Sequence, residues 1–322
     1  MPRISVIIAT YNRCGSLKKT IYSLLEQEEI NHAEYEIIVV DNNSKDRTKE
    51  VAEEAYREKA EMNIVYVFEP TQGKSNALNT GIKVVKGDIV AFIDDDAIAD
   101  KKWLVNIVRC FRDRGCDAMG GRILPLYPND TPEWVRKHRE LLAGPIVSHD
   151  YGEETMEYDK KTMYPFVGAN MAVKKSCFEG NGYFRTDLGP AAGTCGEETE
   201  LFARLWEANK KIVYCGAASV QHETEKARMT YSYFAKWWIK RGRYRARMEQ
   251  NRVKTLALVF GFPRYLLPDI LESVWGCLIN IADRQNFLKN WFELFLKIGV
   301  GLESWRLYQI AQKPTVMIKN EV

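Results

Sequence analysis

Three consecutive aspartates, Asp94, Asp95 and Asp96, follow the apolar run DIVAFI at 88–93. A short apolar run of this kind predicts a buried strand. Because side chains alternate along a strand, we expect Asp94 and Asp96 on one side of the chain and Asp95 on the other. Two converging carboxylates suit a hard divalent cation such as Mg²⁺ or Mn²⁺, which would relieve their mutual repulsion. The alternative interpretation is a solvated acidic turn.

A second acidic cluster, GEETE at 196–200, lies much later in the chain and opens a helix predicted over 197–208. The helix dipole favours acids in a first turn, which explains the cluster without any function. In the functional interpretation one of these acids is a general base. His222 ends the run SVQH at 219–222. A single histidine is more often structural, but together with two acidic clusters it is a candidate ligand for a metal or a pyrophosphate.

Two further polar segments follow predicted strands. Asp41 ends the run YEIIVVD at 35–41 and could bind a nucleobase or ribose, or cap the next helix. Ser44 and Asp46 are better placed as caps, which leaves Asp41 for a ligand. The segment GKS at 73–75 opens a helix, where backbone amides and a lysine attract phosphate, although the spacing is not that of a Walker A loop.

The elements that would position these residues alternate between strand and helix. Apolar runs predict strands over 3–10, 35–41, 62–68 and 88–93, and helical spacing predicts helices over 15–29, 46–60, 74–85 and 100–114. This alternation indicates a parallel sheet with helices on both faces. Ligands bind such sheets at the carboxyl ends of the strands, so the polar segments should meet at one rim.

The pattern changes after the fourth predicted strand. Prolines and glycines mark an irregular segment over about 125–165, which is typical of a lid. Order returns at 166–173, followed by strands near 211–215 and 217–221. Residues 230–310 are expected to be mostly helical.

Composition narrows the class of protein. The chain has 322 residues and a net charge of +3, so its overall charge does not indicate nucleic-acid binding. Its seven cysteines are scattered and form no C-x-x-C pair, which argues against a disulfide framework or a structural zinc site and for a reducing compartment. No signal peptide or membrane-spanning helix is expected.

Taken together, the motifs resemble family 2 glycosyltransferases of the GT-A fold over about residues 3–250. The resemblance rests on the order and spacing of SVIIATYNR at 5–13, IIVVDNNSKDRT at 37–48, GKSNALNTGI at 73–82, FIDDDA at 92–97, PFVGANMAVKKSCFEGNGYF at 165–184, GEETEL at 196–201 and IVYCGAASVQH at 212–222. It implies an α/β catalytic domain over 1–229 with a Rossmann-like, mostly parallel sheet. The donor-binding half would be 1–124 and the acceptor-binding half 125–229, with a helical extension over 230–322.

The resemblance also implies a reaction: transfer of a sugar from a nucleotide-diphosphate sugar to an acceptor hydroxyl, with inversion at the anomeric carbon. The donor is expected to be a UDP-sugar, and the acceptor a glycan or a lipid-linked molecule. The implied donor residues are Thr10, Tyr11, Arg13, Asp41, Lys74, Asn76, Asp94 and Asp95. Mn²⁺ or Mg²⁺ would be held by Asp96, Asp94 and His222, with Asp96 the direct ligand.

The acceptor side and the base follow from the same resemblance. Gly168, Ala169 and Asn170 would shape the sugar and acceptor side. The family usually has Glu-Asp where this chain has Glu197 and Glu198, and the aspartate is the usual base. Glu198 occupies its place, but the longer side chain leaves the base open between the two glutamates.

The last third combines basic and apolar segments. KWWIKRGRYRAR at 236–247 suits anionic phosphates or a membrane interface. An apolar stripe follows at Leu266, Leu267, Ile270, Leu271, Val274, Trp275, Leu278 and Ile279, and a similar one over 287–298. These helices could pack on the catalytic domain, form a homo-oligomer or lie on a bilayer. We favour a cytoplasmic enzyme in peripheral contact with the cytoplasmic face of the membrane.

Two other functions are compatible with a nucleotide-binding α/β sheet. A nucleotidyltransferase would make a sugar nucleotide and release pyrophosphate, but its Gly-rich N-terminal loop is replaced here by TYNR at 10–13. A non-catalytic nucleotide-sugar-binding protein would not need the acidic residues and His222 intact. A nucleic-acid partner is not expected, because only the segment at 236–247 would suit one.

Overall fold

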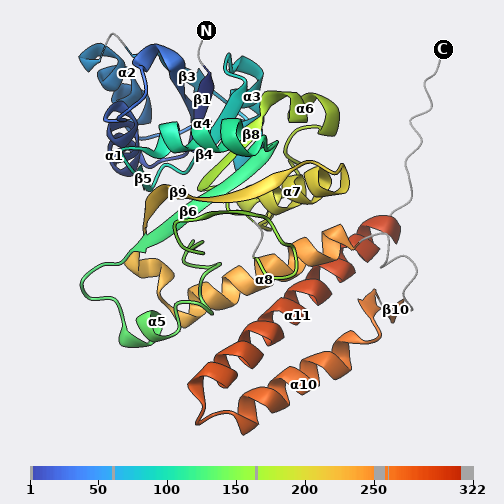
Figure 1. Ribbon diagram of the computed structural model, residues 1–322. Helices are drawn as coiled ribbons and strands as arrows, with labels where there is room; N and C mark the ends of the chain where they lie inside the picture. The colour runs from blue at the N-terminus through green and yellow to red at the C-terminus, as the bar shows by residue number, and fades with distance from the viewer. Residues whose placement is uncertain (1–2, 60–61, 164–165, 250–257, 260, 313–322) are drawn as a thin grey trace, which may run out of the picture. The chain divides into compact units, whose positions relative to one another are not determined.

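The computed structural model describes residues 3–59, 62–163, 166–249, 258–259 and 261–312 (Figure 1). The chain divides into two compact units. Unit 1 comprises residues 1–192 and 196–226, and unit 2 comprises residues 193–195 and 227–322. Unit 1 contains the sheet and the polar segments that follow its strands, so it carries the candidate chemistry.

Unit 1 is built on one large mixed sheet. Its strands are β1 (Ile4–Thr10), β2 (Tyr35–Asp41), β3 (Ile64–Phe68), β4 (Ile89–Ile93), β5 (Ala97–Ala99), β6 (Ala118–Leu126), β7 (Thr155–Glu157), β8 (Asn170–Lys174) and β9 (Ile212–Glu223). They are ordered β3-β2-β1-β4-β8-β6-β9-β5, with β7 paired to β9. The first four strands are mutually parallel, and β8 runs antiparallel to both of its neighbours.

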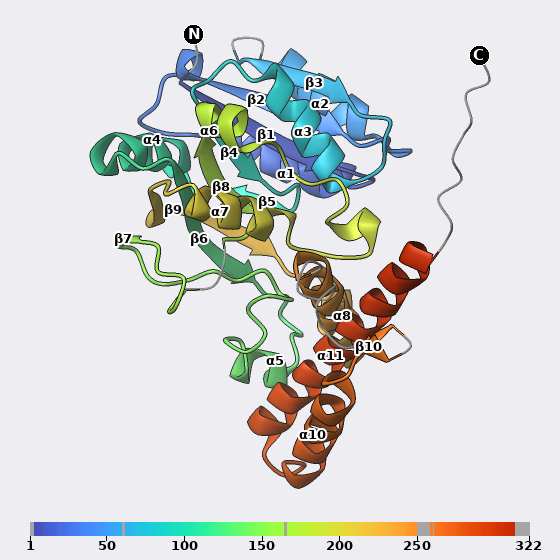
Figure 2. The ribbon, with the colours of Figure 1, turned by 90° about the vertical axis from the view of Figure 1, so that its right-hand side faces the viewer.

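Helices cover both faces of this sheet. On one face lie α1 (Cys14–Leu25), α2 (Thr48–Glu58) and α4 (Trp103–Arg114). On the other lie α3 (Lys74–Val84), α6 (Lys175–Asn181) and α7 (Glu197–Glu207), as Figure 2 shows. The shorter elements of unit 1 are η1 (His32–Glu34), α5 (Glu133–Lys137) and η2 (Pro190–Ala192). The predicted α/β sheet flanked by helices is therefore confirmed.

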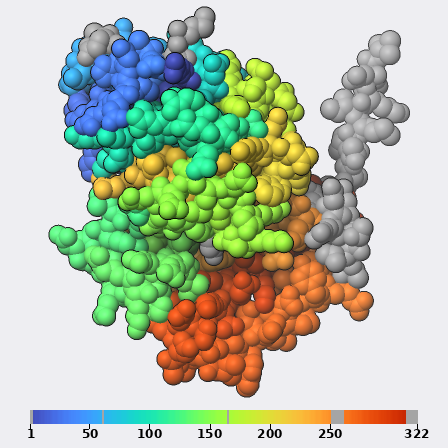
Figure 3. Space-filling view, viewed as in Figure 1, coloured from blue at the N-terminus to red at the C-terminus, as the bar shows by residue number. Residues whose placement is uncertain are grey.

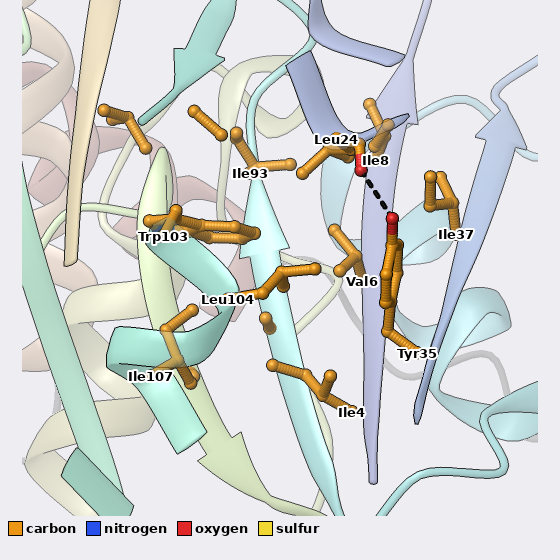
Figure 4. Packing of buried hydrophobic residues seen from close by; sticks show 14 of the residues in the cluster. Ile4, Val6, Ile8, Leu24, Tyr35, Ile37, Ile93, Trp103, Leu104 and Ile107 are labelled. Carbon is orange, nitrogen blue, oxygen red and sulfur yellow. Dashed lines mark hydrogen bonds between the residues drawn. The ribbon is translucent and has the colours of Figure 1, made fainter. Parts of the chain in front are cut away.

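The alternation of side chains along β1 separates two cores. Ile4, Val6 and Ile8 point to the face covered by α1 and α4, where Leu24 and Trp103 are fully buried (Figure 4). The Tyr35 hydroxyl enters this core and donates a hydrogen bond of 2.8 Å to the Leu24 carbonyl oxygen. The same alternation turns Ile7 to the opposite face. Strands buried on both faces explain why the sequence shows continuous apolar runs rather than alternation.

The predicted strands and helices of the first half agree with β1 to β4 and α1 to α4 to within a few residues. The segment predicted to be irregular is mostly loop, apart from α5 and β7. Of the strands of unit 1, β5, β6 and β7 were not predicted. The strands predicted near 211–215 and 217–221 are one strand, β9, with a change of register opposite Gly121 and Arg122 of β6.

Strand β6 was not predicted because it contains two consecutive glycines, Gly120 and Gly121. A Cβ atom at Gly120 would overlap the ring of Phe166, and one at Gly121 would overlap the side chain of Asn170. Glycine weakens a strand in general, but here it leaves room for a neighbouring side chain to cross the sheet surface. The composition that argues against a strand is therefore what lets β6 lie between β8 and β9.

We predict that Gly120→Ala destabilises the protein, because the added methyl group would displace the buried ring of Phe166. The free energy of unfolding should fall by about 1–3 kcal/mol, measured by urea denaturation. Gly180→Ala is the matched control, because a Cβ atom at this position in α6 meets nothing within 4 Å. Equal stability of the two variants would contradict this explanation.

Unit 2 is largely helical. It contains α8 (Tyr231–Met248), α10 (Leu266–Ile279) and α11 (Arg284–Gln312), the short helix η3 (Lys226–Arg228) that begins at its boundary, and a hairpin of β10 (Leu258–Val259) and β11 (Phe262–Pro263). Helix α11 packs against both α8 and α10. Gly242 and Gly299 lie where α8 and α11 meet, because a Cβ atom on either would overlap backbone of the other helix. Residues 250–257 and 260, within the region predicted to be helical, lie outside the described residues.

Candidate functional site

The candidate site lies at the carboxyl ends of the parallel strands. Thr10 ends β1 and is paired in register with Asp41, which ends β2. Strand β1 has β2 on one side and β4 on the other, so the chain order reverses at β1. In open α/β sheets this reversal leaves a crevice beyond the strand ends, where ligands bind. The three aspartates follow β4 at the same rim.

We expected the aspartates to continue β4, but they form a turn. The strand ends at Ile93, and the Asp94 carbonyl oxygen accepts a hydrogen bond of 3.1 Å from the Ala97 amide. Strand β5 then pairs antiparallel with β9, with Ala97 opposite His222. The pairing of β5 with β9 therefore brings His222 to the aspartates. Side-chain alternation along a strand, the reason we gave for their convergence, does not apply.

The turn nevertheless gathers three metal-ligating side chains. Asp94, Asp96 and His222 each offer one ligand atom, and these atoms lie within 4.8 Å of one another. His222 Nε2 lies 3.0 Å from Asp96 Oδ1, and both side chains are buried. His222 Nδ1 is also buried and has no hydrogen-bond partner among the described residues. Two carboxylates and an imidazole at this distance could hold a divalent cation.

Two cationic side chains neutralise the aspartates. Arg13 Nη1 forms an ion pair with Asp96 and lies 3.5 Å from Asp95 Oδ1, while its Nη2 lies 2.9 Å from Glu225. Lys74 Nζ lies 2.5 Å from Asp94 Oδ1. Burial raises the pKa of Asp95 to about 6, although Arg13 opposes the shift. Every aspartate of the turn thus has a positive charge beside it.

Lys74 also connects the aspartates to the second acidic cluster. A Cβ atom added to Gly168 would lie 3.5 Å from Lys74 Nζ and 3.9 Å from Glu198 Cβ, so these side chains approach the same glycine. Burial lowers the pKa of Lys74, but Asp94, Glu197 and Glu198 together raise it above its ordinary range. The ammonium group is therefore charged and is shared by the two acidic clusters.

Glu198 differs from Glu197 in its environment. Glu198 Oε2 is buried and accepts no hydrogen bond from the described residues. Burial, together with the charge of Glu197, raises the pKa of Glu198 to about 8, although Lys74 opposes the shift. A carboxylate with a raised pKa and an unsatisfied oxygen is suited to accept a proton.

Asp41 is more tightly held than we expected. Its Oδ1 accepts a hydrogen bond of 2.8 Å from the Ser44 amide, and its Oδ2 accepts one of 2.8 Å from the Tyr66 hydroxyl. Asp46, which we predicted to cap α2, accepts a hydrogen bond of 3.1 Å on its Oδ1 from the Thr48 amide, but the N-cap residue of the helix is Arg47. Asp41 thus supports its own turn and is oriented by Tyr66. A ligand at this end of β2 would meet a carboxylate whose position is already set.

Three residues near the site were not predicted from the sequence: Asn42, Tyr66 and Glu225. Asn42 Oδ1 accepts from the Gly73 amide at 2.7 Å, and its Nδ2 donates to the Thr71 carbonyl oxygen at 2.7 Å, so it holds the loop that delivers Lys74. Tyr66 and Glu225 orient Asp41 and Arg13. Asn42 could have been found as the amide directly after a strand, within DNN. Tyr66 and Glu225 carry no local signal.

Some predicted site residues lie apart from this cluster. Ala169 and Asn170 are buried, and the Asn170 amide is used within the core: its Oδ1 accepts from Trp103 Nε1 at 2.9 Å, and its Nδ2 donates to two backbone carbonyl oxygens. Asn76 donates to the Gln72 carbonyl oxygen at 3.1 Å. Tyr11 is 47% exposed. Of the three predicted acceptor residues, Gly168 is the one beside Lys74 and Glu198.

Several named proteins are similar in sequence to this chain. Glycosyltransferase AglE of Haloferax volcanii is 35% identical over 129 residues, which are 40% of this chain and 42% of that protein. The succinoglycan biosynthesis protein ExoM of Rhizobium meliloti is 24% identical over 245 residues, 76% of this chain and 74% of that protein. The glucosyl-dolichyl phosphate glucuronosyltransferase of Haloferax volcanii is 25% identical over 248 residues, 73% of this chain and 74% of that protein.

Solved structures share the fold. The mannosyltransferase PcManGT from Pyrobaculum calidifontis, in complex with GDP-Man and Mn²⁺, has a TM-score of 0.57 at 19% identity and covers 98% of this chain and 76% of that one. Residues 1–349 of S. aureus TarS in complex with UDP-GlcNAc have a TM-score of 0.56 at 16% identity and cover 98% of this chain and 93% of that one. These likenesses confirm the predicted GT-A fold.

The sequence model of one protein family matches more than half of the chain. Residues 5–181 match "Glycosyl transferase family 2", a span that contains β1 to β4, the aspartate turn and α3 with Lys74. The predicted family is thereby confirmed. The chain belongs to glycosyl transferase family 2.

Proposed function

We propose that this chain transfers a sugar from a nucleotide-diphosphate sugar to an acceptor hydroxyl, with a divalent cation at the aspartate turn. The observation that carries the proposal is the position of Lys74, which pairs with Asp94 on one side and approaches Glu198 on the other. In a sugar transferase the diphosphate site and the general base must lie this close. The diphosphate leaves the anomeric carbon, and the acceptor hydroxyl that the base deprotonates attacks the same carbon.

The donor side of the proposal uses the residues of the strand ends. Asp94, Asp96 and His222 would hold Mn²⁺ or Mg²⁺, which when bound neutralises the charge that builds on the departing nucleoside diphosphate. Lys74 and Arg13 would then exchange their aspartate partners for phosphate oxygens. Asp41, held by Tyr66, would accept hydrogen bonds from the nucleobase or ribose. Thr10 and Tyr11 would lie along the same pocket.

The acceptor side depends on Glu198. This side chain would take the proton of the acceptor hydroxyl as the oxygen attacks the anomeric carbon and the bond to the diphosphate breaks. One displacement from the side opposite the leaving group inverts the configuration at that carbon. The raised pKa of Glu198 favours proton capture. Gly168 would leave room for the sugar between Lys74 and Glu198, because it has no side chain to fill that space.

The substrates are proposed from the related proteins. GDP-Man and UDP-GlcNAc are bound by structures of the same fold, and we propose a UDP-sugar as the donor to test first. A relative in Campylobacter jejuni is named GalNAc(5)-diNAcBac-PP-undecaprenol beta-1,3-glucosyltransferase. We propose a glycan or lipid-linked acceptor, and an enzyme that works in peripheral contact with the membrane. A nucleotidyltransferase would instead release pyrophosphate, so the product identifies the reaction.

The first prediction concerns the cation. Asp96→Asn should lower nucleoside diphosphate release by at least about 100-fold, because the amide no longer carries the charge that holds the cation. Release should be measured from a panel of UDP-, GDP- and dTDP-sugars with Mn²⁺ or Mg²⁺. Asp88→Asn is the matched control, because Asp88 precedes β4 as Asp96 follows it, and Asp88 is exposed. Release that continues undiminished in excess chelator would contradict the proposed cation site.

The second prediction separates the two glutamates. Glu198→Gln should bind the donor with unchanged affinity but lower the transfer rate by about 10²–10⁴-fold, because it lacks the base. Glu197→Gln should retain more activity. Donor affinity is measured by calorimetry and transfer by nucleoside diphosphate release with acceptor. A dead Glu197→Gln with an active Glu198→Gln would assign the base to Glu197.

The third prediction follows from the raised pKa of Glu198. The folded protein binds this proton more tightly than the unfolded chain, so the carboxylate lowers stability as pH rises from about 4.5 through about 8. Glu198→Gln removes that effect and should raise the free energy of unfolding at pH 9 by on the order of 1 kcal/mol or more relative to wild type, with little change at pH 4. Denaturant titrations at both pH values test this. If Glu198→Gln were less stable than wild type at pH 9, the buried carboxylate of Glu198 would have to be compensated by neighbouring groups.

A further inference from the structure

Helix α10 of unit 2 exposes large apolar side chains along its whole length. Seven large apolar residues of the helix and the turn after it are exposed, from 38% for Val274 to 76% for Ile281: Leu267, Leu271, Val274, Trp275, Leu278, Ile279 and Ile281. Among the exposed positions of α10, all of which the structure describes, Glu272 is the charged one. We call this surface the α10 face. Contiguous apolar surface of this kind marks an interaction site.

The opposite side of α10, which packs against α11, is more polar. Lys297 Nζ of α11 donates to the Asp269 carbonyl oxygen at 2.9 Å and to Ser273 Oγ at 2.8 Å. Gly276 lies directly against the side chain of Asn290. Leu266 and Ile270 add apolar contacts near the start of the helix. Beyond Leu266 and Ile270 at its start, helix α10 thus turns small and polar groups inward and large apolar groups outward.

This arrangement is the reverse of an amphipathic helix packed in water, which buries its apolar side. Helices surrounded by lipid show the same reversal: small and polar residues lie between helices, and apolar residues face outward. Figure 1 shows α11 between α8 and α10, and Figure 3 shows the side chains of α10 beside those of α11. Among the described helices, α11 is thus the neighbour of α10, and its contacts leave the α10 face uncovered.

The structure divides the apolar stripe expected from the sequence. Leu266 and Ile270 contribute to the packing between helices, whereas Leu267, Leu271, Trp275 and Leu278 belong to the α10 face. The basic and aromatic segment of α8 is also partly used internally. Trp238 stacks on Phe292, and Arg247 forms a buried ion pair with Glu303.

Charge is distributed unevenly along the chain. Residues 227–322 contain 16 Lys and Arg against 7 Asp and Glu, whereas residues 1–226 contain 30 against 36. On α8, Lys236, Lys240 and Arg245 are exposed. An excess of positive charge on the part of the chain that carries an exposed apolar helix favours an anionic surface and disfavours a second copy of the same part.

We propose that the α10 face docks this protein on an anionic lipid surface. The helix has 14 residues, about 21 Å of length, which is shorter than the roughly 30 Å hydrocarbon core. It would therefore lie along the surface, with its apolar side chains between the headgroups and the acyl chains and Trp275 near the headgroups. Basic side chains of unit 2 would pair with lipid phosphates. This inference rests on the membrane contact of the proposed function, for which it names the surface, but not on the proposed sugar transfer.

The test uses the full chain and vesicles of phosphatidylglycerol, with vesicles of phosphatidylcholine for comparison. Wild type should co-sediment with the anionic vesicles and more weakly with the neutral ones. Leu271→Gln with Trp275→Gln should lower the bound fraction at least tenfold. The matched control, Tyr56→Gln with Val84→Gln, changes exposed apolar residues of unit 1 and should bind as wild type does. A double α10 variant that binds like wild type would overturn the proposal.

Three further measurements complete the test: the thermal midpoint, fluorescence quenching by brominated lipid, and analytical ultracentrifugation. The substituted side chains are exposed, so the thermal midpoint of the double variant should match wild type. Trp275→Phe should keep binding but lose part of the fluorescence quenching produced by brominated lipid. Analytical ultracentrifugation without lipid tests the competing occupant. A wild-type dimer that the double variant abolishes, with no vesicle binding by either protein, would assign the α10 face to a second copy and overturn the lipid proposal.

Discussion

Repulsion among carboxylates is the constraint on which the site depends. Asp94, Asp95 and Asp96 lie in one turn, and at least two of them are buried, so they cannot all be ionised without nearby positive charge. Arg13 and Lys74 supply that charge. The helices that follow β1 and β3 must therefore begin where these two side chains reach the end of β4. The balance of charge at the aspartates thus determines where the surrounding helices begin.

The same constraint explains why a cation and a diphosphate could enter the site together. A divalent cation and an arginine are alternative ways of neutralising Asp96. If a cation bound to Asp94, Asp96 and His222, Lys74 would lose its pairing with Asp94 and Arg13 its pairing with Asp96. The turn would then carry an excess of positive charges. A diphosphate is the group that would balance them. Binding of the cation and of the nucleotide should therefore be coupled, since each makes the charge of the other acceptable.

How much of this could be predicted from the sequence depends on the range of the contacts. Continuous apolar runs identified β1, β2 and β4 because strands buried on both faces need no partner to be recognised. Strand β3 has a similar apolar run, although it lies at the end of the sheet and is only partly buried. The convergence of Asp94 and Asp96 was predicted correctly but for the wrong reason, since a turn and the pairing of Ala97 with His222 produce it. Strand β6 was missed because Gly120 is required by Phe166, a contact across the sheet. Tyr66 and Glu225 were missed because each contacts a site residue that is distant in sequence, Asp41 and Arg13 respectively.

Buried polar atoms without partners are unfavourable in a folded protein and are expected at functional sites. Glu198 Oε2 and His222 Nδ1 are two such atoms, and both belong to side chains at the strand-end rim. Core packing alone would select apolar residues at these positions. Their presence indicates that stability is reduced where an incoming proton or substrate can supply a hydrogen bond, or a cation can bind a free lone pair.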